Sequence, residues 1–265
     1  MSLRAEGQAP TRGNLICDLD GVVYRGREPV EGSPAALAAI AAAGWTIIFS
    51  TNNSARTPED VAERIEFITG YPARPEQVIT SAGAAAQLLA ESKSRTFVLG
   101  GPGVVAALEA EGIPVVTAAA EAEAVVVGLT FDLTYDLLRD AATAVMAGAR
   151  LIATNQDPTY PAENGLWPGA GSIVAAVETA TGVSAEVAGK PFPPMRNLIR
   201  SRLGGGEVWI VGDRPDTDLA MAKDEPAWHT ALVLSGVTTE PIEPAPDMVA
   251  ANLAEVVQAL LAPGG

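Results

Sequence analysis

Two aspartates near the start of the chain, Asp18 and Asp20, stand at the end of an apolar run and are followed by a glycine. The run 14–18 is predicted to be a strand, and ligands bind at the carboxyl ends of strands in open parallel sheets. Carboxylates held close together repel one another, so a hard divalent ion, Mg²⁺ above all, is their natural partner. A solvated, aspartate-rich turn is the alternative. EF-hand calcium binding is excluded, because Pro29 stands where that loop needs its last glutamate.

A second acidic cluster follows an apolar strand late in the chain. The run 208–211 leads into Gly212, and then come Asp213, Asp216 and Asp218. Helix N-capping by one of the last two aspartates explains a single acid, but not three acids after a glycine turn. The cluster therefore indicates a functional role at the carboxyl end of a strand.

Two further segments carry groups that suit an oxyanion. The predicted strand 45–50 leads into hydroxyl and amide side chains, which include Thr51, Asn52 and Asn53 and can donate hydrogen bonds. Lys190 follows a glycine and precedes a proline in a segment otherwise poor in lysine. Asparagine-rich turns are usually structural and most single lysines are simply exposed, so each segment alone is also compatible with a structural role.

These residues need elements that position them, and the chain predicts an α/β fold with a doubly wound parallel sheet. Short β-branched runs alternate with longer alanine- and leucine-rich segments, which is typical of βαβ units. The expected strands are 14–18, 45–50, 77–80, 96–99, one near 115, 125–129, 151–154, 208–211 and 231–234. The expected helices are 34–43 with Ser33 as N-cap, 58–69, 82–91, 103–111, 135–147, 172–181, 194–203, 216–223 and 253–261. An irregular segment is expected at 155–167.

Composition narrows the classes of partner. Thirty-two acidic and 17 basic residues give a formal charge of −15, which argues against nucleic-acid binding and means that a small anion needs a local positive site. The lone Cys17 can form no intramolecular disulfide, and residues 1–13 lack the apolar core of a signal peptide, so we expect a cytoplasmic protein. The longest apolar stretch, 35–49, is shorter than the roughly 18 to 20 residues needed to span a bilayer, so no membrane partner is expected.

The order of these motifs resembles the haloacid dehalogenase superfamily of phosphohydrolases. It is most similar to the NagD-like, p-nitrophenylphosphatase-type branch, over residues 14–261. The motifs that carry the resemblance are Asp18-Leu19-Asp20-Gly21-Val22-Val23-Tyr24, Thr51-Asn52-Asn53-Ser54, Phe97-Val98-Leu99-Gly100, Ala153-Thr154-Asn155, Gly189-Lys190-Pro191, Gly212-Asp213-Arg214-Pro215-Asp216-Thr217-Asp218 and Leu232-Val233-Leu234-Ser235-Gly236-Val237-Thr238.

The resemblance implies a Mg²⁺-dependent phosphatase that hydrolyses small-molecule phosphate monoesters through an aspartyl-phosphate intermediate. Asp18 matches the nucleophile, and Asp20 matches the general acid and base. The metal is expected between the Asp18 carboxylate, the backbone carbonyl of Asp20 and Asp213. Asp218 matches a supporting acid that positions the lysine or a metal-bound water.

The resemblance also assigns the oxyanion-binding segments. The phosphate-holding positions match Thr51, Asn52, Asn53 and Lys190, and the lysine is expected to take part in catalysis. These donors would provide the local positive site that the acidic chain as a whole lacks.

The resemblance divides the chain into a core and an inserted α/β cap, formed by residues 1–93 with 188–265 and by residues 94–187. A polar turn near Ser92 marks the first boundary independently. A cap supplies substrate-recognising groups and excludes water. We expect these groups in the irregular segment, where Asn155 and Asp157 are candidates and a turn role is the alternative.

Several small metabolites fit the implied substrate class: glycerol 3-phosphate, phosphoglycolate, pyridoxal phosphate and sugar or nucleotide monophosphates, of which the resemblance slightly favours glycerol phosphate. A phosphotransferase or mutase would use the same chemistry with a hydroxyl in place of water. A non-catalytic sensor of phosphorylated metabolites is the rival from another class, but a binder has no use for a nucleophile pressed against its ligand. A homodimer joined through the cap is a further expectation.

Three features are interpreted as structural. The glycine-rich turn 100–103 lacks the full dinucleotide-binding spacing. Cys17 is expected to pack in the core, and His229, the only histidine, is expected to pack or cap near a strand start. At 223–230 the sequence departs from the glycine-rich turn that the family shows there.

Overall fold

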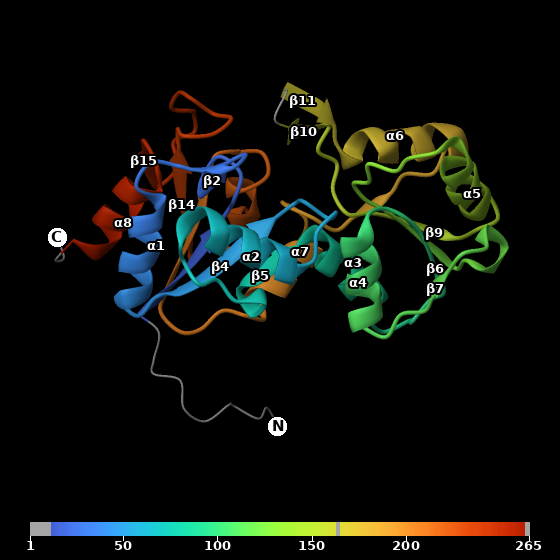
Figure 1. Cartoon of the computed structure of the whole chain (residues 1–265), viewed down its shortest axis with the longest axis horizontal. Helices are drawn as coiled ribbons and strands as arrows, with labels where there is room; N and C mark the ends of the chain where they lie inside the picture. The colour runs from blue at the N-terminus through green and yellow to red at the C-terminus, as the bar shows by residue number, and fades with distance from the viewer. Residues whose placement is uncertain (1–11, 163–164, 263–265) are drawn as a thin grey trace. The chain divides into compact units, whose positions relative to one another are not determined.

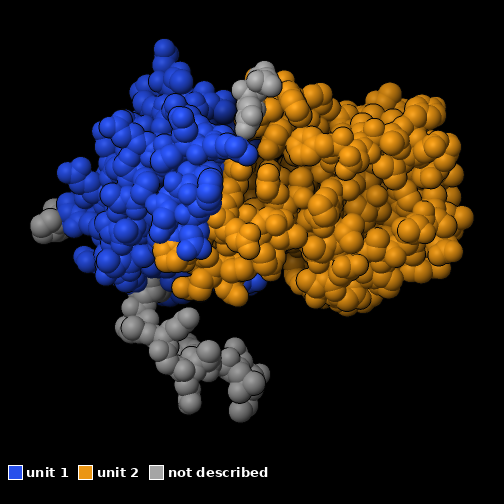
Figure 2. Space-filling model, viewed as in Figure 1, with its two compact units in different colours: residues 1–49, 65–71, 200–265 blue, residues 50–64, 72–199 orange. Residues whose placement is uncertain are grey.

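The computed structural model describes residues 12–162 and 165–262 (Figure 1). Contacts divide the chain into two compact units, which Figure 2 colours separately: residues 1–49, 65–71 and 200–265 form the first, and residues 50–64 and 72–199 form the second. Each unit contains its own parallel sheet, and the expected α/β class is confirmed. Within the described ranges, no helix has both the length and the apolar character to cross a membrane.

The sheet of the first unit places the ends of two distant strands side by side. Five parallel strands follow one another in the order β15-β14-β13-β1-β4. Their bounds are Gly13–Cys17 for β1, Thr46–Thr51 for β4, Glu207–Gly212 for β13, Trp228–Val233 for β14 and Met248–Ala250 for β15. Cys17 at the end of β1 is level with Val211 of β13. The residues that follow β1 and β13 therefore leave the sheet at the same edge.

Two helices and a small hairpin complete the first unit. Helices α1 (Ser33–Ala42) and α8 (Leu253–Leu261) pack against each other and bury apolar side chains that include Leu37, Ile40 and Val256. Strands β2 (Tyr24–Arg25) and β3 (Glu28–Pro29) form an antiparallel hairpin after β1 that the sequence did not predict.

Ser33 does not cap helix α1, so that prediction is wrong. Gly32 takes the cap position with a φ of 76°, a left-handed conformation that suits glycine. The fully buried Ser33 hydroxyl donates instead to the Val23 carbonyl, at 2.6 Å. The serine therefore ties the start of α1 to the segment that follows β1.

The predicted helix at 216–223 is also wrong, because only a 3-10 turn forms there, at Leu219–Ala222. The Asp218 N–H donates to the Arg214 carbonyl at 2.8 Å, and the Asp218 carboxylate accepts from the Arg214 N–H at 3.1 Å. The N–H and the carboxylate of Asp218 are thus used in closing a tight turn over the first residues of the predicted helix.

The second unit contains a five-stranded parallel sheet in the order β12-β9-β8-β6-β7. Its strands are β6 (Thr96–Leu99), β7 (Val115–Val116), β8 (Ala124–Val127), β9 (Arg150–Ala153) and β12 (Glu186–Val187). The further elements are β5 (Val78–Thr80), α3 (Ser81–Leu89), α4 (Pro102–Ala110), α5 (Tyr135–Met146) and α6 (Ala170–Thr181), while α2 (Pro58–Thr69) and α7 (Pro193–Arg200) run across the boundary between the units. Buried aliphatic side chains of β6, β8 and β9 pack with those of α5 and α6 to form the core of this unit.

A hairpin occupies much of the segment that was expected to be irregular. Strands β10 (Thr159–Ala162) and β11 (Gly165–Pro168) pair antiparallel. Two prolines interrupt the strand pattern in sequence, and proline is tolerated in a sheet mainly at its edges. Phe131 contacts the rings of Tyr160 and Trp167 edge to face, with centroids 5.6 and 6.2 Å away.

The predicted domain boundaries stay a prediction. All five strands of the second sheet lie between residues 96 and 187, which is inside the expected cap 94–187. The division by contacts is wider, because it also assigns 50–64, 72–93 and 188–199 to the second unit.

The buried Ser33 hydroxyl leads to a prediction on stability. Ser33→Ala removes one buried hydrogen bond, so we expect the free energy of unfolding in urea to fall by about 1 kcal/mol. Ser33→Asp should cost more, because a carboxylate has no proton to donate and would face the Val23 carbonyl. At a true N-cap, aspartate would replace serine at little cost. A Ser33→Asp variant as stable as the native chain would therefore contradict the buried-donor role.

Candidate active site

Asp18 and Asp213 emerge next to each other at the carboxyl edge of the first unit's sheet. Asp18 is the first residue after β1, and Asp213 is the first residue after β13. The Asp18 N–H donates to the carbonyl of Val211 at 3.0 Å, which extends the ladder between the two strands. The parallel register therefore brings together two acids from opposite ends of the chain.

A third carboxylate joins them. Oxygens of Asp18, Asp213 and Asp218 all lie within 4.8 Å of one another, and this group is the one set of potential metal-binding side chains found in the described part of the chain. Asp213 and Asp218 are buried, with 1% and 2% of their surface exposed, while Asp18 is half-buried. Like charges in a partly buried space destabilise one another unless a cation compensates. An all-oxygen, all-carboxylate donor set fits a hard ion such as Mg²⁺ or Ca²⁺.

Two glycines allow the backbone to pack directly against the Asp213 carboxylate. A Cβ atom on Gly236 would lie 1.9 Å from Asp213 Oδ2, and one on Gly21 would lie 2.7 Å from the same oxygen. The Val237 N–H donates to this oxygen at 2.5 Å. The carboxylate is thus enclosed by the turn after β1 and the loop after β14.

Asp218 is held in a similar way. The Arg214 N–H donates to its Oδ2 at 3.1 Å, and a Cβ atom on Gly212 would lie only 2.2 Å from the Asp218 Cβ. The 3-10 turn that begins after Asp218 has no side-chain cap, so Asp218 does not act as a helix N-cap. Asp216 is exposed, and its Oδ1 atom lies 3.8 Å from Nε of Arg214.

The side chain of Asp20 is not part of the three-carboxylate group. Asp20 lies in a tight turn in which the Leu19 carbonyl accepts from the N–H groups of Val22, Val23 and Tyr24. The expected contribution of Asp20 to a metal was its backbone carbonyl, so its place in the ligand set stays a prediction.

Lys190 and Asn52 form one hydrogen-bonded unit within the second compact unit. The Lys190 N–H donates to Asn52 Oδ1 at 2.8 Å, and Asn52 Nδ2 donates to the Lys190 carbonyl at 3.3 Å. The Lys190 ammonium is buried, with 4% of the residue exposed, and donates to the Ser50 carbonyl at 3.0 Å. Thr51 Oγ1 accepts from the Asn53 N–H at 3.1 Å. The four predicted phosphate-binding residues therefore lie in one local network.

The two candidate substrate residues belong to the same network. Asn155 Nδ2 donates to the Asn52 carbonyl at 2.7 Å, and Asn155 Oδ1 accepts from the Asp157 N–H at 3.0 Å. The Asp157 carboxylate accepts from Asn52 Nδ2 at 3.1 Å. Asn155 therefore stabilises a turn, and Asp157 holds the side chain of Asn52. Contact with substrate stays a prediction for both residues.

Some participants were missed from the sequence. Gly236 and Val237, which enclose Asp213, belong to a family motif but carry no chemistry that the sequence would single out. Ser81 is a second case, because its hydroxyl donates to the Asn52 carbonyl at 2.6 Å. No pattern of residue types distinguishes Ser81 from the other serines, because its role depends on where helix α3 begins. The glycine after a predicted strand end was the one available signal for Gly236.

Comparison with known proteins covers most of the chain. A family model described as haloacid dehalogenase-like hydrolase matches residues 15–114, and a second, described as HAD-hydrolase-like, matches residues 187–256. A D-glycerol 3-phosphate phosphatase of Mycobacterium tuberculosis is 38% identical over 229 residues, which cover 85% of this chain and only 64% of that enzyme's length. An acid sugar phosphatase of Staphylococcus saprophyticus is 37% identical over 229 residues, which cover 85% of this chain and 87% of the relative.

Solved structures share the fold. A hypothetical protein of Pyrococcus horikoshii superposes with a TM-score of 0.87 at 37% identity, covering 93% of this chain and 99% of that one. A glycerol phosphate phosphatase of Mycobacterium tuberculosis, solved in complex with magnesium, superposes with a TM-score of 0.81 at 36% identity, covering 91% of this chain and 74% of that one.

The packing of Gly236 leads to a prediction on cation binding. Gly236→Ala would place a methyl group 1.9 Å from Asp213 Oδ2, so the carboxylate and the loop must move apart, which disturbs the packing that holds Asp213 beside the other two acids. We expect Mn²⁺, titrated into the metal-free chain and followed by electron paramagnetic resonance, to bind at least about tenfold more weakly. Gly205→Ala is the matched control, because nothing lies within 4 Å of its added methyl group. Equal affinity in both variants would contradict the role of this packing in holding Asp213 for the ion.

Proposed function

This chain belongs to the haloacid dehalogenase-like hydrolases, and we propose that it is a Mg²⁺-dependent phosphatase that hydrolyses small phosphate monoesters through an aspartyl-phosphate on Asp18. The observation that carries the proposal is the meeting of the Asp18, Asp213 and Asp218 carboxylates at the carboxyl edge of the first sheet. Relatives that are named phosphatases over most of this chain's length support the reaction class.

The metal would be held by the three carboxylates and by the backbone carbonyl of Asp20. The donor set is hard and anionic, and a similar phosphatase has been solved with magnesium. When bound, the ion would offset the repulsion between the nucleophile and the phosphate and stabilise charge on the phosphoryl oxygens.

The first half of the proposed reaction uses two aspartates of the turn after β1. An Asp18 carboxylate oxygen attacks phosphorus, so a bond forms between this oxygen and phosphorus while the bond from phosphorus to the ester oxygen breaks. Asp20, protonated at this stage, gives its proton to the leaving oxygen, which departs as an alcohol. Asp18 is half-buried at the carboxyl edge of the sheet, where ligands bind in open parallel sheets.

The second half returns the enzyme to its starting state. The Asp20 carboxylate takes a proton from water, and the water oxygen attacks phosphorus. The bond between phosphorus and the Asp18 oxygen breaks, which releases inorganic phosphate and leaves Asp18 ionised. Asp20 ends the cycle protonated, ready for the next ester.

Phosphate binding is assigned to the network around Lys190. A buried ammonium, held in place by its hydrogen bond to the Ser50 carbonyl, supplies a positive charge that would attract an anion. Thr51 and Asn53 would add hydroxyl and amide donors. For Asn52 the hydrogen bonds support a second role, which is to position Lys190, since both polar atoms of the Asn52 side chain contact the backbone of Lys190.

The proposed substrates are small phosphorylated metabolites. The names of the relatives favour glycerol 3-phosphate and sugar phosphates, and phosphoglycolate, pyridoxal phosphate and nucleotide monophosphates complete the set to be tested. We place glycerol 3-phosphate first. The cytoplasmic location and the homodimer through residues 94–187 stay predictions, and analytical ultracentrifugation of the purified chain would test the latter.

The reaction is tested by phosphate release from a panel of monoesters, p-nitrophenyl phosphate included, with and without Mg²⁺. We expect release that EDTA abolishes and that Asp18→Asn lowers by at least about 10³-fold, because an amide oxygen is a far weaker nucleophile than a carboxylate. Asp216→Asn is the matched control, since Asp216 is exposed and outside the three-carboxylate group.

Three other outcomes would contradict the proposal. Unchanged release by Asp18→Asn would exclude Asp18 as the nucleophile. Ester binding without turnover in the native chain would identify a sensor. Transfer of the phosphoryl group to an added alcohol, in preference to water, would identify a phosphotransferase.

A further inference from the structure

One peptide unit of the loop after β14 determines where the Asp213 carboxylate lies. The Cα of Gly236 packs so closely that an added Cβ would come within 1.9 Å of Asp213 Oδ2. The next residue, Val237, donates its N–H to the same oxygen at 2.5 Å. Any movement of this loop is therefore passed directly to the carboxylate.

Arg25 holds the same loop from the side of the hairpin. Its Nε and Nη2 atoms both donate to the Ser235 carbonyl, and the Nε distance is 2.5 Å. A peptide unit is planar, so a guanidinium that fixes the Ser235 carbonyl also fixes the nitrogen of Gly236. Hydrogen bonds from an ionised donor are roughly twice as strong as neutral ones.

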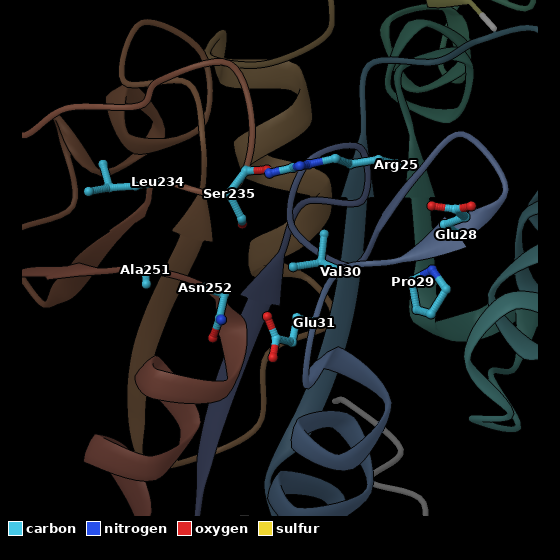
Figure 3. Close-up of a pocket in the computed structure, with 9 residues that line it drawn as sticks. All are labelled: Arg25, Glu28, Pro29, Val30, Glu31, Leu234, Ser235, Ala251 and Asn252. Atoms are coloured by element: carbon cyan, nitrogen blue, oxygen red, sulfur yellow. The ribbon is translucent and has the colours of Figure 1, made fainter.

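The contact closes a ring of interactions around the acids. Figure 3 shows the Arg25 side chain reaching from the hairpin side to the backbone oxygen of Ser235. The Ser235 hydroxyl donates to the Gly21 carbonyl at 2.7 Å, and the Gly21 N–H donates to the Tyr24 carbonyl at 2.8 Å. Tyr24 is the residue before Arg25, so the turn, the hairpin and the loop after β14 brace one another.

We propose that Arg25 is a positioning residue of the metal site, which it acts on through Ser235 and thereby through Asp213. The inference rests on the proposed function, because it requires Asp213 to be a ligand of the divalent ion. Without the brace, the loop is freer to move, and the repulsion among the three carboxylates favours a wider spacing. The affinity for the ion then falls.

The charge of Arg25 by itself predicts the opposite result. Removing a positive charge from the first unit makes the potential around the acids more negative, which strengthens the binding of a cation. Weaker binding after loss of Arg25 is therefore evidence for positioning. Arg27 provides the matched control, because it is exposed at the turn of the same hairpin and Arg27→Ala removes the same charge.

The test is a titration of the metal-free full chain with Mn²⁺, followed by electron paramagnetic resonance. We expect Arg25→Ala to bind Mn²⁺ about tenfold more weakly, as is usual when a group that orients a metal ligand is lost. The Mn²⁺ affinity of Arg25→Lys should lie between those of the native chain and Arg25→Ala, because an ammonium restores one charged donor but not the paired geometry. Arg27→Ala should bind as tightly as the native chain or slightly more so. Thermal unfolding without metal checks that every variant is folded.

Chemical rescue provides a readout that a general loss of stability would not give. Arg25 lies at the wall of a pocket of about 330 Å³, which Glu28 and Glu31 also line (Figure 3). We expect guanidinium ion at millimolar concentration to enter this pocket in Arg25→Ala and donate to the Ser235 carbonyl in place of the lost side chain. We expect it to restore Mn²⁺ affinity, whereas tetramethylammonium, which has no N–H donor, should not.

The outcomes separate the inference from the proposed function. If the native chain binds no Mn²⁺, the metal site of the proposed function fails. If the native chain binds Mn²⁺ and Arg25→Ala binds it equally well, the positioning role is overturned while the proposed function stands. Equal weakening in Arg25→Ala and Arg27→Ala would also overturn it, because the effect would then belong to the hairpin as a whole.

Discussion

Repulsion among three carboxylates is the constraint on which the rest of the site depends. The oxygens of Asp18, Asp213 and Asp218 share a space in which all lie within 4.8 Å of one another, and like charges at such distances favour separation. Backbone atoms oppose that separation at two of the acids. Glycines let main-chain atoms pack against two of the acids, and backbone N–H groups donate to their oxygens. Backbone contacts do not neutralise the charge, so we propose that a divalent cation completes the arrangement.

The sheet determines that these acids meet at all. Asp18 and Asp213 come from opposite ends of the chain, and the residues between them form the whole second unit and strands β4 and β13 of the first sheet. The parallel pairing of β1 with β13, which places Cys17 level with Val211, is a contact of very long sequence separation. Such contacts form only after a large loss of chain entropy. The entropy lost in closing this long loop and the repulsion among the acids must both be compensated by apolar burial elsewhere in the fold.

The sequence predicted the parts of this arrangement that depend on local signals. The alternation of short β-branched runs with longer helical segments led to the α/β class, and local helix signals led to helix α8 with its observed bounds. The expectation that Asp18 and Asp213 lie together came from the family resemblance. Prediction from the sequence failed where a polar side chain had two possible partners. Ser33 suits an N-cap, but its hydroxyl donates to a carbonyl brought near by tertiary packing. Where the helix 216–223 was expected, the Asp218 carboxylate instead accepts from the Arg214 N–H and closes a turn. The closeness of Gly236 depends on the path of a loop, which residue types alone do not encode.

The hydrogen bonds of Asn52 have a consequence for how this protein can diverge. Its amide contacts both the backbone of Lys190 and the carboxylate of Asp157, and Asp157 belongs to a segment that precedes the exposed hairpin β10–β11. A segment of this kind is where mutations that alter ligand preference accumulate most easily. A substitution at Asp157 also disturbs the turn that carries the buried ammonium. Substitutions that change ligand preference should therefore accumulate in the exposed hairpin. Position 157 itself should change slowly during evolution.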